Sequence, residues 1–228
     1  MTAWPPDNSL LASLTGYIGS AMLLLMGARR IASWDELRRR LSNPQTILCL
    51  GNGPSSEAPA LEDLSFDSLF RVNWVWRDRG RHANPNLVFT ADFDAPPSGT
   101  APIICFPTRK DANRILAGFA RQRVGLPVEY VVFPEQAPEL PRAWSYRPTN
   151  GALMVAAAVQ LRPSRLVVAG IDLYRHPDGK YPGSANESND YDAIHHRDID
   201  LAFIRAALNQ FDGEVELLSE QLWTALGN

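Results

Sequence analysis

The sequence predicts an α/β fold: a single Rossmann-like domain built on a mainly parallel sheet. From Thr46 onward, short runs rich in β-branched and aromatic residues alternate with longer runs of helical periodicity, as in domains whose helices connect parallel strands. A hydrophobic content of 45% in 228 residues is also enough to bury the core of one ordinary to large domain. We therefore expect one folded unit over residues 46–228.

The expected elements follow the chain in alternation. Strands are expected at residues 46–50, 69–72, 87–90, 102–106, 128–132, 165–169 and 214–217. Helices are expected at residues 33–41, 110–123, 151–161, 196–211 and 219–226. The first of these helices has Ser33 as its N-cap and Glu36 three residues on, which is the spacing of a capping box. Residues 175–194 are rich in Gly, Pro, Asn, Asp and Ser, so we expect a long loop that covers a site, binds a ligand or is disordered.

The segment before this unit, residues 1–45, contains an unusual apolar stretch. Residues 9–28 carry no charged side chain, and Arg29 and Arg30 follow directly. The stretch is long enough in principle to span a bilayer. Ser, Thr and Gly dilute it, and no signal-peptide cleavage pattern follows. An apolar helix in the core or in a subunit contact, a helix lying on a membrane surface, and a true span all stay open.

The overall charge offers no electrostatic argument for a nucleic-acid partner. Lys and Arg number 22 against 25 Asp and Glu, which gives a formal net charge of −3. The two cysteines, Cys49 and Cys105, sit in apolar runs expected to be strands, and no other Cys or His lies at metal-ligand spacing from them. We therefore expect buried, reduced thiols in a cytosolic protein.

A glycine-rich turn follows the first expected strand. Gly51 and Gly53 flank Asn52, and Pro54 and Ser55 follow. Glycines at such a point let the backbone approach a ligand, and exposed N–H groups suit a phosphate or a ribose. A dinucleotide-binding fingerprint would need a further Gly where Ser56 stands. The pattern alone is equally compatible with a tight turn of purely structural importance.

Two further segments place polar residues where a ligand could bind. The first runs from Arg147 to Gly151 at the start of a small-residue helix, and the strand after that helix ends in Gly170, Ile171 and Asp172. A helix start and a strand end of this kind lie on the same rim of a parallel sheet, where ligands bind. The second segment is a polar cluster, residues 191–200, which includes His195 and His196 at the start of the next helix.

These motifs together resemble the bacterial sialyltransferases of glycosyltransferase family 42. The shared features, in order, are Gly-Asn-Gly-Pro-Ser after the first strand, Asn73 after the second strand, the Arg-x-Thr-x-Gly helix start, Gly-Ile-Asp-x-Tyr at a strand end, and a His five residues before Asp200. The resemblance covers residues 46–228. It implies a GT-A-like variant of the Rossmann-like fold, an inverting and metal-independent transfer from a CMP-activated sugar, and a role in cell-surface glycan synthesis.

The resemblance also implies roles for individual residues. The catalytic residues would be His195 as general base, with Tyr174 and Tyr181 binding the leaving phosphate. The donor would be bound by Gly51, Asn52, Gly53, Ser55, Asn73, Arg147, Thr149, Asn150, Gly151, Gly170 and Asp172. Asn150 departs from the family's Ser, and the spacing from Tyr174 to Tyr181 is one residue longer than expected. The resemblance implies an acidic ulosonic donor sugar, with sialic acid ahead, and Asn150 in place of Ser leaves room for Kdo.

Histidine suits a general base near neutral pH, and phenol groups suit stabilisation of phosphate charge. A different reading starts from Asp92 and Asp94, since Asp-x-Asp after a strand binds Mn²⁺ or Mg²⁺ in many enzymes that use nucleotide diphosphates. A pyrophosphokinase-like relative sharing the glycine turn belongs to the same metal-dependent class. The other alternative is a non-catalytic nucleotide-binding or membrane-scaffold protein.

The expected partners are a CMP-sugar donor and a glycan or glycolipid acceptor, with no cofactor, no metal and no nucleic acid. Residues 9–28 could bring the protein to the inner face of the cytoplasmic membrane. The family's tetramers leave a homo-oligomer open. The expected location is therefore the cytoplasm or its membrane face.

Overall fold

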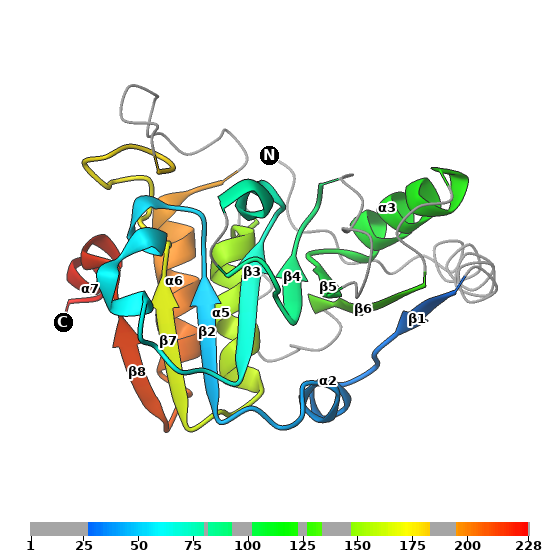
Figure 1. The fold of residues 1–228 in the computed structure, drawn as a ribbon, viewed down its shortest axis with the longest axis horizontal. Coiled ribbons are helices and arrows are strands. Elements are labelled where there is room, and N and C mark those ends of the chain that lie inside the picture. Colours follow the sequence, from blue (N-terminus) through cyan, green and yellow to red (C-terminus); the bar gives the residue numbers. More distant parts are fainter. Residues whose placement is uncertain are drawn as a thin grey trace.

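A computed structural model describes residues 27–79, 82–92, 102–122, 127–133, 147–182 and 195–227. Their strands form one sheet in which every pair is parallel, in the order β1-β6-β5-β4-β3-β2-β7-β8 (Figure 1). The strands are β1 Ala28–Arg30, β2 Thr46–Leu50, β3 Ser68–Val72, β4 Leu87–Phe89, β5 Ile103–Phe106, β6 Val128–Val132, β7 Arg165–Ala169 and β8 Glu214–Leu217. The α/β fold with a mainly parallel sheet is confirmed.

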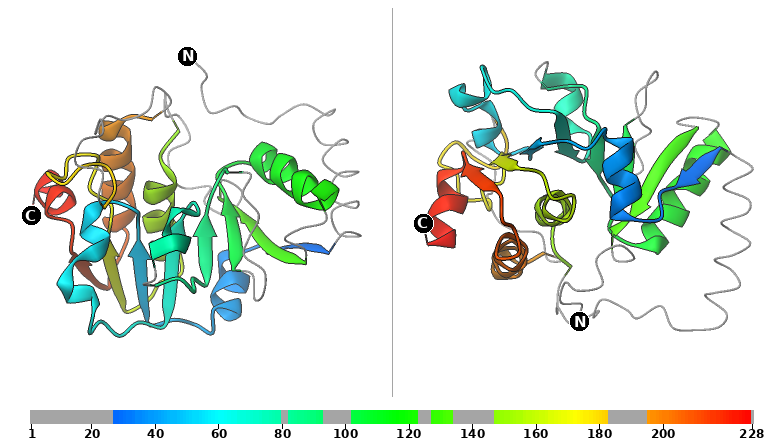
Figure 2. Two further views of the ribbon diagram at one scale, coloured as in Figure 1. Left: turned by 45° about the horizontal axis from the view of Figure 1, so that its top comes forward. Right: turned by 90° about the horizontal axis from the view of Figure 1, so that it is seen from below.

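Helices cover both faces of the sheet, which makes three layers (Figure 2). One face is covered by α5, Asn150–Gln160, and α6, Arg197–Leu208. On the other face, α3, Arg109–Gln122, covers β4 to β6, and the short helices η1, Pro54–Glu57, and η2, Pro59–Leu61, lie over β2, β3 and β7. The remaining helices are α2 Trp34–Arg40, η3 Val75–Arg79 and α7 Glu220–Leu226.

Helix α5 is the central helix of its layer. Every side chain from Ala152 to Val159 is buried, as expected for a helix that is apolar on all sides. It packs on β2, β3, β4 and β7, and along α6. Its alanines let the helix axis approach the sheet closely, so its N-terminus is held at the carboxyl ends of the central strands.

Strand β1 was not predicted from the sequence. It has only three residues, pairs with β6 from Ala28 opposite Val128, and contains Arg29 and Arg30. A short, charged edge strand carries no alternating pattern that a sequence reading could detect. Gly27, at φ +87°, precedes it in the left-handed region that glycine adopts at low cost.

The expected apolar helix at residues 9–28 lies outside the described residues as far as residue 26, and Ala28 belongs to β1 instead. Ile31, Leu37 and Leu41 pack in the main core, so the described part of the predicted N-terminal segment belongs to the same folded unit as β2. For residues 1–26, a segment separate from the domain that follows stays a prediction. In the described ranges, no helix combines the length and the hydropathy that a membrane span needs.

The capping box expected at the start of α2 forms only in part. Ser33 caps α2, since its Oγ accepts from the N–H of Glu36 at 3.1 Å, but the Glu36 carboxylate accepts from the N–H of Ala32 instead of that of Ser33.

Cys49 and Cys105 are free thiols buried in the sheet, and burial raises the pKa of both well above its usual value. The expectation of buried thiols is confirmed.

The order of the strands creates a switch point. From β2 the chain moves through β3, β4, β5 and β6 in one direction, and then returns to place β7 on the opposite side of β2. The carboxyl ends of β2 and β7 therefore diverge into connections that run in opposite directions. Open parallel sheets bind ligands at such a point.

Candidate active site

An open cavity lies at this switch point, and the unfilled space in it, open solvent at its mouth included, is about 710 Å³. It is bounded by the segments after β2, β3 and β7, by the first turn of α5, and by the segment before α6. The predicted residues that line it are Gly51, Asn52, Gly53, Asn73, Thr149, Asn150, Gly151, Gly170, Asp172, Tyr174, Tyr181 and His195. The structure thus brings together residues that are up to about 140 positions apart in the chain.

Two predicted site residues do not line the cavity. Ser55 is buried beneath it, where its Oγ donates to Asp172 Oδ1 at 2.5 Å. The Arg147 guanidinium pairs with Asp111 of α3 at 3.2 Å. Both residues therefore support their neighbours, and any direct contact of theirs with a donor stays a prediction.

The glycines of the predicted turn allow two backbones to meet. The N–H of Gly53 donates to the carbonyl of Gly170 at 2.9 Å. A Cβ on Gly51 would lie 2.1 Å from that carbonyl oxygen, and Gly170 itself has φ +69°. The close approach of the segments after β2 and β7 therefore explains why glycine stands at positions 51 and 170. It also forms the floor of the cavity.

Asp172 is held by the glycine turn. Its carboxylate is only 5% exposed and accepts from both the N–H and the Oγ of Ser55, at 2.9 and 2.5 Å. The same Ser55 Oγ accepts from the N–H of Gly170 at 2.7 Å. These bonds satisfy a buried charge at the edge of the cavity and fix the connection after β7 against the connection after β2.

The amide of Asn52 has a defined orientation. Its Nδ2 donates to the carbonyl of Val72 at 3.0 Å, and its Oδ1 accepts from Nη2 of Arg71 at 3.4 Å. Arg71 is buried, and its guanidinium lies 5.7 Å from the centre of the Trp76 ring. A buried cation therefore supports the polar edge on which Asn52 faces the cavity.

Asn73 and Asn150 join two walls of the cavity. Asn150 Nδ2 donates to Asn73 Oδ1 at 2.8 Å, which links the first turn of α5 to the segment after β3. Asn73 has φ +51°, a left-handed conformation that Asn tolerates better than most residues. Asn150, where the resembling family has Ser, therefore reaches across the cavity.

Thr149 forms the N-cap of α5, and its donors are directed to Asp200 on the first turn of α6. Its N–H and its Oγ1 donate to the two carboxylate oxygens of Asp200, both at 2.8 Å, and Oγ1 also accepts from the N–H of Ala152 at 3.3 Å. Asp200 is 3% exposed. This pair of hydrogen bonds between a carboxylate and a helix start fixes the beginnings of the two helices relative to one another.

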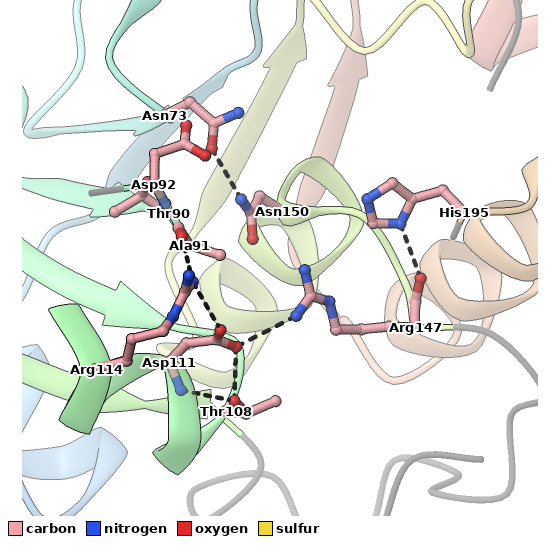
Figure 3. A network of polar contacts seen from close by, with 10 residues as sticks. All are labelled: Asn73, Thr90, Ala91, Asp92, Thr108, Asp111, Arg114, Arg147, Asn150 and His195. Atoms are coloured by element: carbon pink, nitrogen blue, oxygen red, sulfur yellow. Dashed lines mark hydrogen bonds and ion pairs between the residues drawn. The ribbon is translucent and has the colours of Figure 1, made fainter. Parts of the chain in front are cut away.

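His195 is held by the chain that precedes α5. Its Nδ1 lies 3.1 Å from the carbonyl oxygen of Arg147. Figure 3 shows that the side chain of Arg147 turns away, toward Asp111, and that the second ring nitrogen of His195 lies on the side of Asn150. Asp111 is in turn bonded to Thr108 and Arg114. The backbone under His195 is thus anchored to α3.

The two adjacent histidines differ in exposure. His195 is half-buried and lines the cavity, whereas His196 is exposed. Both precede α6, which begins at Arg197, one residue later than expected. His196 occupies the N-cap position, but its side chain makes no capping hydrogen bond. His196 therefore has no role in starting this helix through its side chain.

Tyr174 and Tyr181 both reach the cavity from the segment after β7. Leu173 and Tyr174 have φ +51° and +54°, and the turn is closed by the N–H of Arg175, which donates to the carbonyl of Asp172 at 2.9 Å. The ammonium of Lys180 lies 5.4 Å from the centre of the Tyr174 ring and 5.5 Å from that of Tyr181. The longer spacing between the tyrosines thus still places both at one site.

The Asp-x-Asp segment is only partly described. Asp92 is exposed, does not line the cavity, and its N–H donates to Thr90 Oγ1 at 2.9 Å. Asp94 lies outside the described residues. In the ranges that the structure does describe, no three His, Cys, Asp or Glu side chains are grouped so as to hold a metal ion.

Sequence reasoning missed two features of the cavity. One is Lys180, and the other is the contact of Asp200 with Thr149. The sequence relates Asp200 only to His195, five residues earlier, and nothing local indicates that its carboxylate reaches another helix. Lys180 stands in a turn-rich segment with no motif, although its place directly before Tyr181 was a usable signal.

The chain is similar to known proteins in its fold but not in its sequence. No protein-family model matches the chain, and no curated protein matches its sequence. Among solved structures, it is similar to the monofunctional α-2,3-sialyltransferase Cst-I of Campylobacter jejuni, with a TM-score of 0.56, 18% identity, and coverage of 78% of this chain and 77% of that one.

It is also similar to the sialyltransferase CstII of Campylobacter jejuni in two complexes. In the complex with the substrate analogue CMP-3FNeuAc, the TM-score is 0.53 at 16% identity, with 76% of this chain and 81% of that one covered. In the complex with cytidine-5'-monophosphate, it is 0.53 at 18% identity, with 77% and 80% covered. The chain therefore shares the fold of these sialyltransferases.

Proposed function

We propose that this protein is an inverting, sialyltransferase-like glycosyltransferase with a GT-A-like fold. It transfers an acidic ulosonic sugar, sialic acid or Kdo, from a CMP-activated donor to a hydroxyl of a glycan or glycolipid. The observation that carries the proposal is His195, which is fixed by the carbonyl of Arg147 at the cavity that Tyr174 and Tyr181 also line. The complexes of CstII with CMP and with CMP-3FNeuAc add support through the shared fold.

His195 is suited to act as the general base. A carbonyl oxygen can only accept, so Nδ1 of His195 carries the proton in its bond with Arg147, and the lone pair of the neutral ring lies on Nε2. That nitrogen would take the proton of the acceptor hydroxyl. The hydroxyl oxygen would then form a bond with the anomeric carbon of the sugar from the face opposite the phosphate.

The same step releases the nucleotide. The bond between the anomeric carbon and the phosphate oxygen breaks, and its electron pair leaves with the phosphate as CMP. Tyr174 and Tyr181 would donate hydrogen bonds to this phosphate as its charge grows. Because the displacement is direct, the anomeric configuration is inverted, and no protein nucleophile or metal ion is needed.

The rest of the cavity would bind the donor. Asn52, Asn73, Gly170 and Asp172 would contact the nucleotide and sugar. The N–H groups in the first turn of a helix have no partner within the helix, so those of Asn150 and Gly151 at the start of α5 suit the sugar's carboxylate. Thr149 would position this turn, because both its donors are directed to Asp200.

CMP release tests the proposal directly. The full chain is incubated with CMP-sialic acid or CMP-Kdo and an oligosaccharide acceptor in the presence of EDTA, and we expect turnover of at least one donor. Turnover that requires Mg²⁺ together with Asp92 and Asp94 would instead indicate an enzyme of nucleotide diphosphates. Binding of CMP without any turnover would indicate a non-catalytic nucleotide-binding protein.

We also propose that the protein works in the cytoplasm at the inner membrane face, through the part of the apolar stretch that precedes β1, residues 9–26, and that it forms a homo-oligomer. The free buried thiols of Cys49 and Cys105 suit a reducing compartment. Liposome flotation of the full chain and of a form lacking residues 1–26, which keeps β1, tests the membrane contact. Light scattering of both forms tests the assembly.

A further inference from the structure

The cavity contains a cation to which the proposed reaction has so far given no role. Among the described residues that line it, Lys180 is the one Lys or Arg side chain. The two carboxylates that line it, Asp172 and Asp200, each bind hydrogen-bond donors of their own, on Ser55 and Thr149. In the part of the chain that the structure describes, Lys180 forms no ion pair with either carboxylate, so its charge is not used by them.

The position of Lys180 relates it to the tyrosines. Its ammonium lies almost equally far from the two rings, at 5.4 Å from Tyr174 and 5.5 Å from Tyr181. A cation at such a distance from aromatic rings gains only a weak attraction at a partly exposed site. An anion that accepted hydrogen bonds from both phenol groups would lie beside the ammonium and would attract it more strongly.

We propose that Lys180 binds the phosphate of the donor and stabilises its charge as CMP leaves, an inference that rests on the proposed function. When the bond from the anomeric carbon to the phosphate oxygen breaks, the electron pair stays on that oxygen, and a phosphodiester with one negative charge becomes a monoester with a charge of about −1.5 to −2. An ammonium beside this oxygen therefore interacts more strongly with the leaving group than with the intact donor.

This assignment accounts for the charge balance of the site. Enzymes that transfer groups from nucleotide diphosphates neutralise the leaving phosphates with a divalent metal or with Lys and Arg. Tyr174 and Tyr181 supply hydrogen bonds but no positive charge. Lys180 supplies that charge from the same short segment, six residues after Tyr174 and directly before Tyr181.

Binding measurements with a matched control separate the phosphate from the rest of the nucleotide. Lys180→Met removes the charge, and Lys110→Met removes the sequence's other lysine, which is exposed on α3. By calorimetry with the full chain, we expect Lys180→Met to weaken CMP binding at least about tenfold and to change cytidine binding less than about twofold. Lys110→Met should match the wild type, and Lys180→Arg should retain most of the CMP affinity.

Kinetics with the preferred CMP-sugar complete the test. We expect Lys180→Met to lower kcat about ten- to a hundredfold while the KM for the donor changes less than about threefold. Unchanged CMP binding and kcat in Lys180→Met, with an active wild type, would overturn the role of Lys180 alone. Equal losses of CMP and cytidine binding would overturn it too, since the effect would not concern the phosphate. A wild type that neither binds CMP nor releases it from a donor would overturn the proposed function itself.

Discussion

Nδ1 of His195 lies 3.1 Å from the carbonyl oxygen of Arg147, so the backbone that leads into α5 determines which ring nitrogen carries the proton. The Arg147 side chain is in turn bonded to Asp111 on α3 at 3.2 Å (Figure 3). His195 is therefore oriented by a main-chain group. Its environment differs from that of His196, which is exposed.

The first prediction separates the orientation of His195 from its basicity. In His195→Asn, the side-chain amide can still donate to the Arg147 carbonyl, but no basic nitrogen replaces Nε2. We expect turnover to fall by about two to four orders of magnitude, the usual contribution of a general base, with CMP affinity within about threefold of wild type. His196→Ala is the control and should retain nearly full turnover. Equal losses in the two variants would show that His195 is not the base.

The second prediction concerns Asp200, which we expect to act through the position of Thr149 and of the segment before α6. In Asp200→Asn, one oxygen that accepts from Thr149 becomes an NH₂ group, which faces a donor. We expect the free energy of unfolding to fall by about 1.5–3 kcal/mol, the range for hydrogen bonds to charged groups, and kcat to fall at least about tenfold.

Asp198→Asn is the matched control, because the Asp198 side chain is 76% exposed on the same turn of α6. It should unfold within about 0.5 kcal/mol of wild type. Urea titration gives the free energy of unfolding, and CMP release on the same preparations gives kcat. If Asp200→Asn lowers kcat without any loss of stability, Asp200 contacts the substrate instead of holding the helices.

The fold could be predicted because its signals are local. Thr46–Leu50, Val128–Val132, Arg165–Ala169 and Glu214–Leu217 were expected at the bounds that the structure has, since each is a run of β-forming residues ended by a turn. Strand β1 could not be predicted, because its pairing with β6 joins residues about 100 positions apart and leaves no pattern in a strand of three residues.

The site was predictable where a residue type at a strand end or helix start is informative in itself. Gly51, Gly170 and Asn150 belong to this class. The contacts of Ser55 with Asp172 and of Thr149 with Asp200 were not predictable, because each joins side chains from elements that only the tertiary fold brings together. For this reason, the sequence assigned Ser55 to the donor, whereas the structure buries it beneath the cavity.

The third prediction follows from that burial. Ser55→Ala removes the hydroxyl that donates to Asp172 and accepts from the N–H of Gly170, and it leaves a buried carboxylate and a buried N–H each short of a partner. We expect a loss of about 2–4 kcal/mol in the free energy of unfolding. Ser56→Ala, at the neighbouring position, should cost less than about 0.5 kcal/mol. Similar values for the two variants in urea titrations would contradict the structural role of Ser55.

The last prediction concerns the donor. Sialic acid carries an N-acetyl group and a longer glycerol tail that Kdo lacks, while both carry the carboxylate and the CMP ester. A cavity that hydrogen-bonds the N-acetyl group leaves polar groups without partners when the group is missing. We therefore expect a preference of at least about a hundredfold in kcat/KM for one CMP-sugar over the other.

Asn150 is the residue that we expect to set this preference, because its bond of 2.8 Å to Asn73 crosses the cavity beside the first turn of α5. The shorter side chain of Asn150→Ser cannot make this bond and leaves more room, so the ratio of kcat/KM for the two donors should change at least about tenfold. Asn209→Ser, at the exposed end of α6, should leave the ratio unchanged. Steady-state kinetics with CMP-sialic acid and CMP-Kdo measure it. An unchanged ratio in Asn150→Ser would assign donor selection to other residues, because the bridge between α5 and the segment after β3 would then have no influence on the sugar.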